Sequence, residues 1–239
     1  MAQYHGPGMI VGDSAQAGVP SVPFEQPKNL FRYGEQSLWS SQRYAVATAL
    51  ANQQSRLFAT PLSQQGQGFQ SSLTIAETSL KEGGRIPAGI AFDAYGISCA
   101  VLLGVTADSK LTLATPVTGV EGTVDIVNVL NNGVLSWDFT QTAVDIAPIS
   151  LIGAGGGAFG TSAVAVTAAA TLATTFAGHL NNGAGNIWIY RKHPVALPGN
   201  STFSILLRFG GAAAAVGATY DLVIKVALFG FYKNVIEIG

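Results

Sequence analysis

The sequence predicts an all-β fold, from the type, the spacing and the number of its apolar segments. From residue 67 onward, short runs rich in Val, Ile, Leu, Thr and aromatic residues recur, and Gly, Pro, Asn and Asp separate them. This spacing is typical of a β-sandwich or a β-barrel. The chain has 239 residues, enough to bury one good-sized core. We therefore expect one main β domain preceded by an N-terminal arm.

The expected strands are nine runs of residues. They lie within residues 69–78, 85–105, 110–117, 122–130, 133–139, 142–152, 186–192, 201–209 and 220–232. Two Leu-Asn-Asn-Gly sequences, at 130–133 and 180–183, predict hairpin turns, because Asn and Gly tolerate the positive φ that such turns need.

The first 66 residues differ from the rest of the chain. Glycine and proline are frequent in residues 1–36, which predicts an extended arm. Residues 37–58 instead predict an amphipathic helix that ends before Pro61. Its apolar stripe consists of Trp39, Val46, Leu50 and Leu57. The stripe could pack on its own domain, dock on a neighbouring subunit or lie on a lipid surface.

Charged residues make up only 10% of the chain, against about 25% in an ordinary soluble domain. Apolar residues make up 48%, yet the long uncharged stretch at 146–190 is interrupted by glycines and threonines and does not resemble a membrane span. The N-terminal residues lack the basic and apolar regions of a secretory signal. So few charges favour a surface that neighbouring subunits cover, and hence an assembly.

The net charge of −1 predicts no bulk attraction to nucleic acid. The charges are nevertheless uneven, because residues 28–56 are mildly basic and residues 86–145 are acidic. The basic residues of the first region are Lys28, Arg32, Arg43 and Arg56. They could face the interior of an assembly or form a solvated scatter of surface charges.

Residues 150–160 contain the spacing G-x-G-x-x-G at Gly155, Gly157 and Gly160. A dinucleotide site also needs an acidic residue about 20 positions later and a surrounding βαβ unit. No Asp or Glu occurs between Asp145 and Asp221. We therefore expect no cofactor here, and interpret residues 153–160 as a mobile loop followed by a loop insertion or a strand of small residues.

The sequence contains no recognisable catalytic constellation, and we expect no enzyme. The three histidines lack metal-ligand spacing, and the serine hydrolase motif G-x-S-x-G is absent. The only cysteine, Cys99, lies in an apolar run and is expected to be a buried, inert thiol. Asp138 and Asp145 would lie on successive strands of a hairpin and are expected to face solvent.

The C-terminal third carries the most specific pattern. A turn at 198–199, a strand, a Gly/Ala loop and a long apolar strand at 220–239 resemble the closing strands of viral jelly-roll capsid proteins. Residues 85–104 are similar to the early strands of such domains. The nearest resemblance is to the capsid proteins of tailless icosahedral bacteriophages, several of which enclose a membrane.

This resemblance implies a single jelly-roll sandwich at residues 67–239 and an arm with a helix at residues 1–66. It implies a virion protein, made in the host cytoplasm, whose partners are copies of itself and other capsid subunits. Its arm would lace neighbouring subunits together and contact an internal lipid membrane or the packaged genome.

The alternative function is a sugar- or receptor-binding β-sandwich of a fibre tip or lectin-like protein. Trp137, Trp188 and Tyr190 would then stack on sugar rings, although packing in the core is the more common role of tryptophan.

Overall fold

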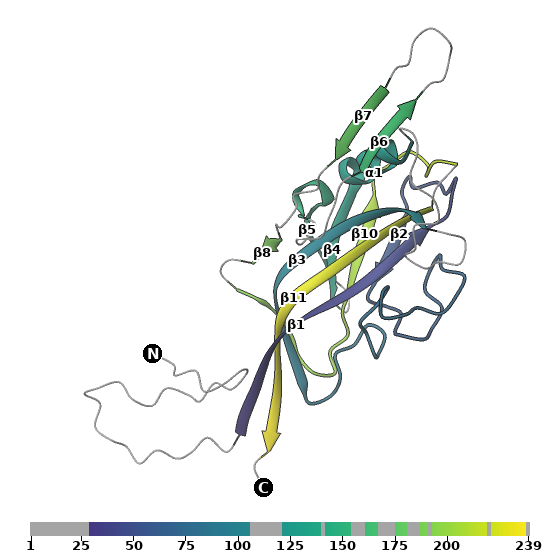
Figure 1. The fold of residues 1–239 in the computed structure, drawn as a ribbon. Helices are drawn as coiled ribbons and strands as arrows, with labels where there is room; N and C mark the ends of the chain where they lie inside the picture. Colours follow the sequence, from purple (N-terminus) through teal and green to yellow (C-terminus); the bar gives the residue numbers. More distant parts are fainter. Residues whose placement is uncertain are drawn as a thin grey trace, which may run out of the picture.

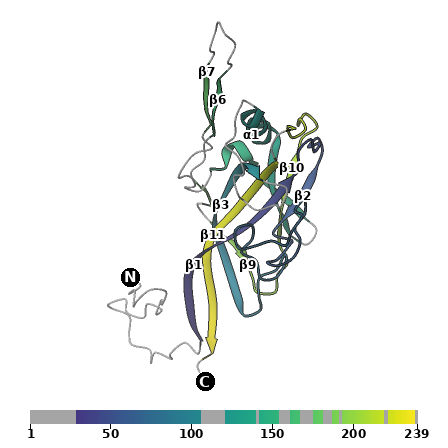
Figure 2. The ribbon, with the colours of Figure 1, turned by 45° about the vertical axis from the view of Figure 1, so that its right-hand side comes forward.

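Two antiparallel β-sheets pack face to face to form an all-β sandwich (Figure 1, Figure 2). The computed structural model describes residues 29–105, 121–139, 142–153, 161–166, 175–180, 187–190, 193–218 and 221–237. The predicted N-terminal arm up to residue 28, the glycine loop at 154–160 and the predicted strand at 110–117 lie outside these residues.

The larger sheet contains β1 (Asn29–Tyr44), β11 (Asp221–Glu237), β3 (Ile90–Val105) and β8 (Trp188–Ile189) in this order, and β9 (Val195–Leu197) also pairs with β3. The smaller sheet contains β2 (Gln54–Leu57), β10 (Ser204–Phe209), β4 (Gly133–Phe139) and β5 (Thr142–Pro148). Consecutive strands therefore alternate between the sheets over the first part of the chain.

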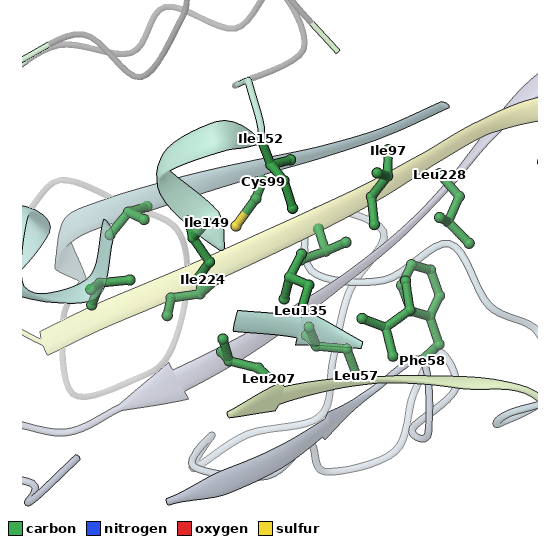
Figure 3. Packing of buried hydrophobic residues seen from close by; sticks show 14 of the residues in the cluster. Leu57, Phe58, Ile97, Cys99, Leu135, Ile149, Ile152, Leu207, Ile224 and Leu228 are labelled. Atoms are coloured by element: carbon green, nitrogen blue, oxygen red, sulfur yellow. The ribbon is translucent and has the colours of Figure 1, made fainter. Parts of the chain in front are cut away.

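The core lies between the two sheets (Figure 3). Along β11, Leu222, Ile224, Val226 and Leu228 alternate with residues that face away from the smaller sheet, and all four are fully buried. Ile205 and Leu207 of β10 face them from the other side. Because side chains of a strand alternate between its faces, this period of two is what the sequence displays in these segments.

Most of the expected strands are confirmed, including those at 85–105, 133–139, 142–152, 201–209 and 220–232. The run at 69–78 is not a strand. It belongs to the long β2–β3 connection (residues 58–89), which consists mainly of turns.

The predicted helix at residues 37–58 is wrong. Trp39 lies in β1, Val46 and Leu50 lie in the β1–β2 loop, and Leu57 lies in β2, so the four residues form no common stripe. Two loop residues, Ala47 and Asn52, have φ values of 58° and 57°, which no α-helix contains. The sandwich thus begins upstream of residue 67, the boundary that the sequence suggested.

Two polar residues on the core-facing side of β1 concealed the alternation of apolar and polar residues that indicates a strand. Ser40 and Gln42 lie between the buried Leu38 and Tyr44 on that side. Ser40 Oγ accepts a hydrogen bond from the Phe58 amide at 2.9 Å, and Gln42 Nε2 donates to the Gln67 carbonyl at 2.9 Å. These bonds make polar residues tolerable at buried positions. They tie β1 to the β2–β3 connection.

The one α-helix of the described chain is α1 (Glu121–Asn132), within a segment expected to be a strand. Its β-branched residues favour strands, but Ile126, Val129 and Leu130 are buried at helical spacing. The expected hairpin turn at 130–133 is instead the end of this helix. A side chain at Gly133 would meet Ile149 Cδ1 at 2.5 Å and the Val129 carbonyl at 2.8 Å, so glycine allows β4 to begin there.

A short 3-10 helix, η1 (Ile149–Leu151), follows β5, and β6 (Thr161–Val166) then pairs with β7 (Thr175–Leu180) as a separate hairpin. The strand interpretation of this small-residue segment is therefore confirmed for β6. The hairpin projects beyond α1 at the end of the molecule opposite to the C-terminus (Figure 1).

Candidate assembly surface

The outer face of the larger sheet, which points away from the smaller sheet, is divided into two halves. The β2–β3 connection covers one half. Its residues Phe69 and Leu73 pack on Val223 of β11 and Leu102 of β3. The other half, around Phe229 and Phe231 of β11, is not covered by this connection. Beyond it, β1 and β11 continue toward the C-terminal end (Figure 1).

A buried ion pair holds the β2–β3 connection on the sheet. Arg43 of β1 donates to Asp221 Oδ2 through Nε at 3.1 Å and Nη2 at 2.5 Å. Its Nη1 donates to the Gly68 carbonyl at 2.5 Å, and Asp221 Oδ1 accepts from the Val46 amide at 2.9 Å. Gly68 has a φ of +79°, and a side chain there would lie 2.1 Å from the Arg43 carbonyl, so only glycine fits.

Arg43 was interpreted either as facing the interior of an assembly or as a solvated surface charge, and the structure contradicts both interpretations. The Arg43 side chain is only 5% exposed, and its charge is neutralised by Asp221. A guanidinium held in this way is costly to separate from its partner and presents no charge to a lipid or a nucleic acid.

Of the other three basic residues, only Arg56 has a side chain that the structure describes. Lys28 lies outside the described residues, and Arg32 is described only as a backbone position in β1. Arg56 lies on the outer face of the smaller sheet, where its side chain is 59% exposed and pairs with Asp138 at 3.0 Å. Of the two with described side chains, Arg43 is buried beneath the β2–β3 connection and Arg56 lies on the smaller sheet, so these two do not share one basic surface.

Contacts of Trp39 secure the covered half further. Trp39 Nε1 donates to the Ile75 carbonyl at 2.8 Å, and Lys225 Nζ lies 5.6 Å from the indole centroid while donating to the Ala76 carbonyl at 2.8 Å. Burial lowers the pKa of Lys225. The predicted docking residue Trp39 thus contacts its own chain here, as Leu50 and Leu57 do in the core.

The uncovered half carries apolar and aromatic side chains. Phe231 is 43% exposed, its ring centroid lies 5.2 Å from that of Tyr95, and Ile189 of β8 is also exposed. The Tyr95 hydroxyl donates to Glu35, which raises the pKa of Tyr95 to about 12. We call Tyr95, Phe229, Phe231 and Ile189 the distal patch. Contiguous apolar patches are typical of interaction surfaces, and we take the distal patch as the candidate contact surface.

The outer face of the smaller sheet is polar. Arg56 pairs with Asp138, which also accepts from Ser204 Oγ at 2.9 Å, and Arg208 pairs with Asp145. Both aspartates therefore have cationic partners, as well as some contact with solvent. The two arginines and two aspartates leave this face without net charge.

A groove of about 510 Å³ lies at the edge of this polar face. Its polar lining includes Arg56, Asp138, Ser204 and Thr202, and Gly83 and Gly84 of the β2–β3 connection also line it. The groove can accommodate a small polar ligand that exchanges hydrogen bonds with an arginine and a carboxylate.

The tryptophans expected at a sugar site have different environments. Trp137 is only 4% exposed, stacks on Phe139 at 5.3 Å and donates through Nε1 to the Tyr190 hydroxyl at 2.9 Å. Its ring is thus part of the core and is unavailable to a ligand. Trp188 is 36% exposed, at the edge of the larger sheet.

The groups considered for other chemistry are inert or unclustered in the described chain. Cys99 is fully buried, and burial raises the pKa of its thiol to about 12, as expected of an unreactive thiol. Among the described residues, no three His, Cys, Asp or Glu side chains are grouped to hold a metal ion. Within the same residues, no helix is long and apolar enough to cross a bilayer.

Sequence reasoning missed the distal patch, because its members come from three strands that only the fold brings together. Phe229 and Phe231 alternate in the sequence, which would have indicated a second apolar face on β11.

Comparison of the chain with protein-family models, with curated proteins and with solved structures gives no match.

Proposed function

We propose that this protein is a virion structural protein, a capsid subunit whose single jelly-roll domain self-assembles into an icosahedral shell. The proposal places it with the shells of tailless icosahedral bacteriophages, made in the host cytoplasm and located in the virion. The observation that carries it is the order of the strands.

The strand pairs follow the pattern of a long hairpin. β1 pairs with β11, β2 with β10, β3 with β8 and β9, and β4 with β5, so strands from the two ends of the domain pair successively toward its middle. The further pairs β11–β3 and β10–β4 wrap this hairpin into two sheets. A jelly roll is such a wrapped hairpin, and capsid proteins and lectins are among the proteins built on it.

The surface supports a shell more than a free monomer. The chain has 10% charged residues, and the distal patch exposes Phe231 and Ile189 on the larger sheet. Subunits that repeat one interface around symmetry axes would cover this patch. No catalytic residue is needed for this role.

The arm has a narrower role in this proposal than the sequence suggested. Residues 1–28, with Lys28 at their end and Arg32 following in β1, would lace neighbouring subunits and contact an internal membrane or the packaged genome. Arg43 has no part in this contact, because Asp221 neutralises it.

Sedimentation velocity and negative-stain imaging test the proposal on the full chain and on a version lacking residues 1–28. A deletion up to residue 60 would be uninformative, because residues 29–57 supply β1 and β2. We expect the full chain to form capsomers, sheets or shells, and the shortened chain to form smaller species. Monomers of both chains at high concentration would contradict the proposal.

Phe231→Asp provides a sharper variant of the same test. A charge in the distal patch would oppose burial and should abolish assembly, whereas Phe231→Leu should retain it. Val144→Asp is the matched control, because Val144 is similarly exposed on the smaller sheet. Equal assembly of Phe231→Asp and wild type would remove the distal patch from the proposal.

The groove beside Arg56 and Asp138 favours a second candidate, a carbohydrate- or receptor-binding module. Jelly rolls also serve as lectins. A glycan array, probed with the wild-type chain and with Asp138→Ala, tests this second candidate function. Binding that the substitution removes would support this function, and no binding in an assembling protein would exclude it.

A further inference from the structure

One edge of the larger sheet is long. β1 has 16 residues, and among the described residues β11 is the one strand that pairs with it. The other edge strands of the larger sheet, β8 and β9, have two and three residues. β2 at the edge of the smaller sheet has four, and β5 contains Pro148 and a register irregularity with β4. Short strands, prolines and bulges are the usual means of preventing edge-to-edge pairing.

The direction of the backbone groups along β1 follows from Trp39. The Trp39 amide donates to Ser79 Oγ at 2.8 Å, and the Trp39 carbonyl accepts from the Ser79 amide at 3.0 Å. Both groups of Trp39 thus point away from β11. The β1–β11 register contains no shift, so the groups of every second residue, including Ser37, Glu35 and Tyr33, also point outward.

The β2–β3 connection covers this edge only from Trp39 onward. Among the described residues, no backbone hydrogen bond joins residues 29–37 of β1 to any segment other than β11. These nine residues contain no proline and no bulge. Figure 2 shows this part of β1 beside β11, past the end of the smaller sheet.

We propose that residues 29–37 pair with the same residues of a second copy, antiparallel across a two-fold axis at Tyr33. An antiparallel edge is its own complement, and centring on Tyr33 is the register that pairs all nine residues. About ten backbone hydrogen bonds would form. This inference deepens the proposed function, on which it rests for the presence of many copies.

Charge disfavours the register that is centred two residues away. With Tyr33 on the axis, Glu35 lies opposite Phe31 of the second copy. Centring on Glu35 would put two carboxylates directly opposite each other, which is destabilising, and would pair only residues 33–37. The net charge of −1 per chain adds little repulsion between copies. The joined edges would also extend the surface that carries Phe231, since Phe231 pairs with Glu35.

Single cysteines test the register in the full chain. The native Cys99 is fully buried, so an introduced thiol is the only one accessible to reagent. Tyr33→Cys puts two thiols at the axis, where the Cα atoms would be about 5.5 Å apart. Ser37→Cys is the control, because its two copies would be about 27 Å apart. We expect a short bifunctional maleimide to cross-link the first variant and not the second.

Proline at an outward-facing amide tests the hydrogen bonds. Glu35→Pro removes one outward N–H on each copy without removing a bond to β11, and Glu35→Ala is its matched control, since both variants lose the contact with Tyr95. Sedimentation equilibrium measures the dissociation constant of the dimer. We expect Glu35→Pro to raise it roughly 100-fold, and Glu35→Ala to leave it within about threefold of the wild-type value.

The possible outcomes distinguish the edge pairing from the proposed function as a shell subunit. Cross-linking at Tyr33→Cys without shells would support the edge pairing and contradict the proposed function. Shells without this cross-link, or with equal cross-linking at Ser37→Cys, would overturn the edge pairing alone. Cross-linking that appears only after deletion of residues 1–28 would show that this segment occupies the edge, and would also overturn it. If Glu35→Pro fails to fold, as judged by circular dichroism, the cysteine pair decides.

Discussion

Arginine–aspartate pairs lie on the outer faces of both sheets, and their surroundings give them different roles. On the larger sheet, Arg43 and Asp221 are buried beneath the β2–β3 connection, with side chains 5% and 8% exposed. On the smaller sheet, Arg56 and Arg208 pair with Asp138 and Asp145 in contact with solvent. A buried pair is costly to break, whereas an exposed pair contributes little. The same chemistry therefore fixes a covering segment on one face and keeps the other face polar.

Breaking the buried pair should have the largest effect on stability. Asp221→Ala leaves the Arg43 guanidinium buried without its partner, and we expect the free energy of unfolding to fall by about 3–5 kcal/mol. Urea denaturation measures the change. Asp145→Ala, the matched change on the smaller sheet, should cost less than about 1 kcal/mol. Equal losses of unfolding free energy in the two variants would contradict the different roles given to the two pairs.

Cys99 tests whether the core between the two faces excludes solvent. Its pKa is about 12 in the folded state, above the usual value near 8.5, so the thiol stabilises the fold below pH 8.5 and this contribution is lost as the pH rises toward 12. Between pH 8.5 and 10 the loss should be about 1–2 kcal/mol. Urea denaturation of Cys99→Ala should show a correspondingly flatter pH dependence, and an identical slope in both proteins would contradict the assignment.

Trp39 provides a smaller test of the covered face. Trp39→Phe removes the hydrogen bond from Nε1 to the Ile75 carbonyl, and we expect a loss of about 1 kcal/mol. The exchange of the Ser79 amide, which donates to the Trp39 carbonyl, should become faster than in wild type. An unchanged exchange rate would mean that the indole does not hold this part of the connection.

The smallest effect is expected at Arg56. Arg56→Gln removes an exposed ion pair, and the stability should change by less than about 1 kcal/mol in low salt and still less in 1 M salt. Thermal unfolding at two salt concentrations measures this difference. A large loss that persists in high salt would indicate that the polar face is structurally as important as the covered one.

Alternation of apolar residues made part of the fold predictable. In β10 and β11, Leu207 and Ile224 recur with their neighbours at a period of two, and both strands lie where the sequence predicted them. β1 was missed because Ser40 and Gln42 occupy buried positions, and their hydrogen-bonding partners lie elsewhere in the chain. α1 was missed because β-branched residues favour strands until tertiary packing decides otherwise.

The candidate surface was less predictable than the strands. Arg43 was interpreted as an exposed charge because its partner Asp221 is 178 residues away in the sequence. The distal patch likewise combines Tyr95 with Phe231, residues that only the pairing of β3 with β11 makes neighbours. Long-range pairing of this kind leaves no local signal in one sequence, whereas the low charge content was visible and favoured an assembly from the start.

Hydrogen exchange measured by mass spectrometry, at protein concentrations below and above the onset of assembly, tests the central claim most directly. The claim is that copies meet through the uncovered half of the larger sheet. We predict that assembly slows exchange in residues 29–37 of β1, with little change in residues 204–208 of β10 and 134–138 of β4. Slower exchange on the smaller sheet with an unchanged β1 edge would contradict the account.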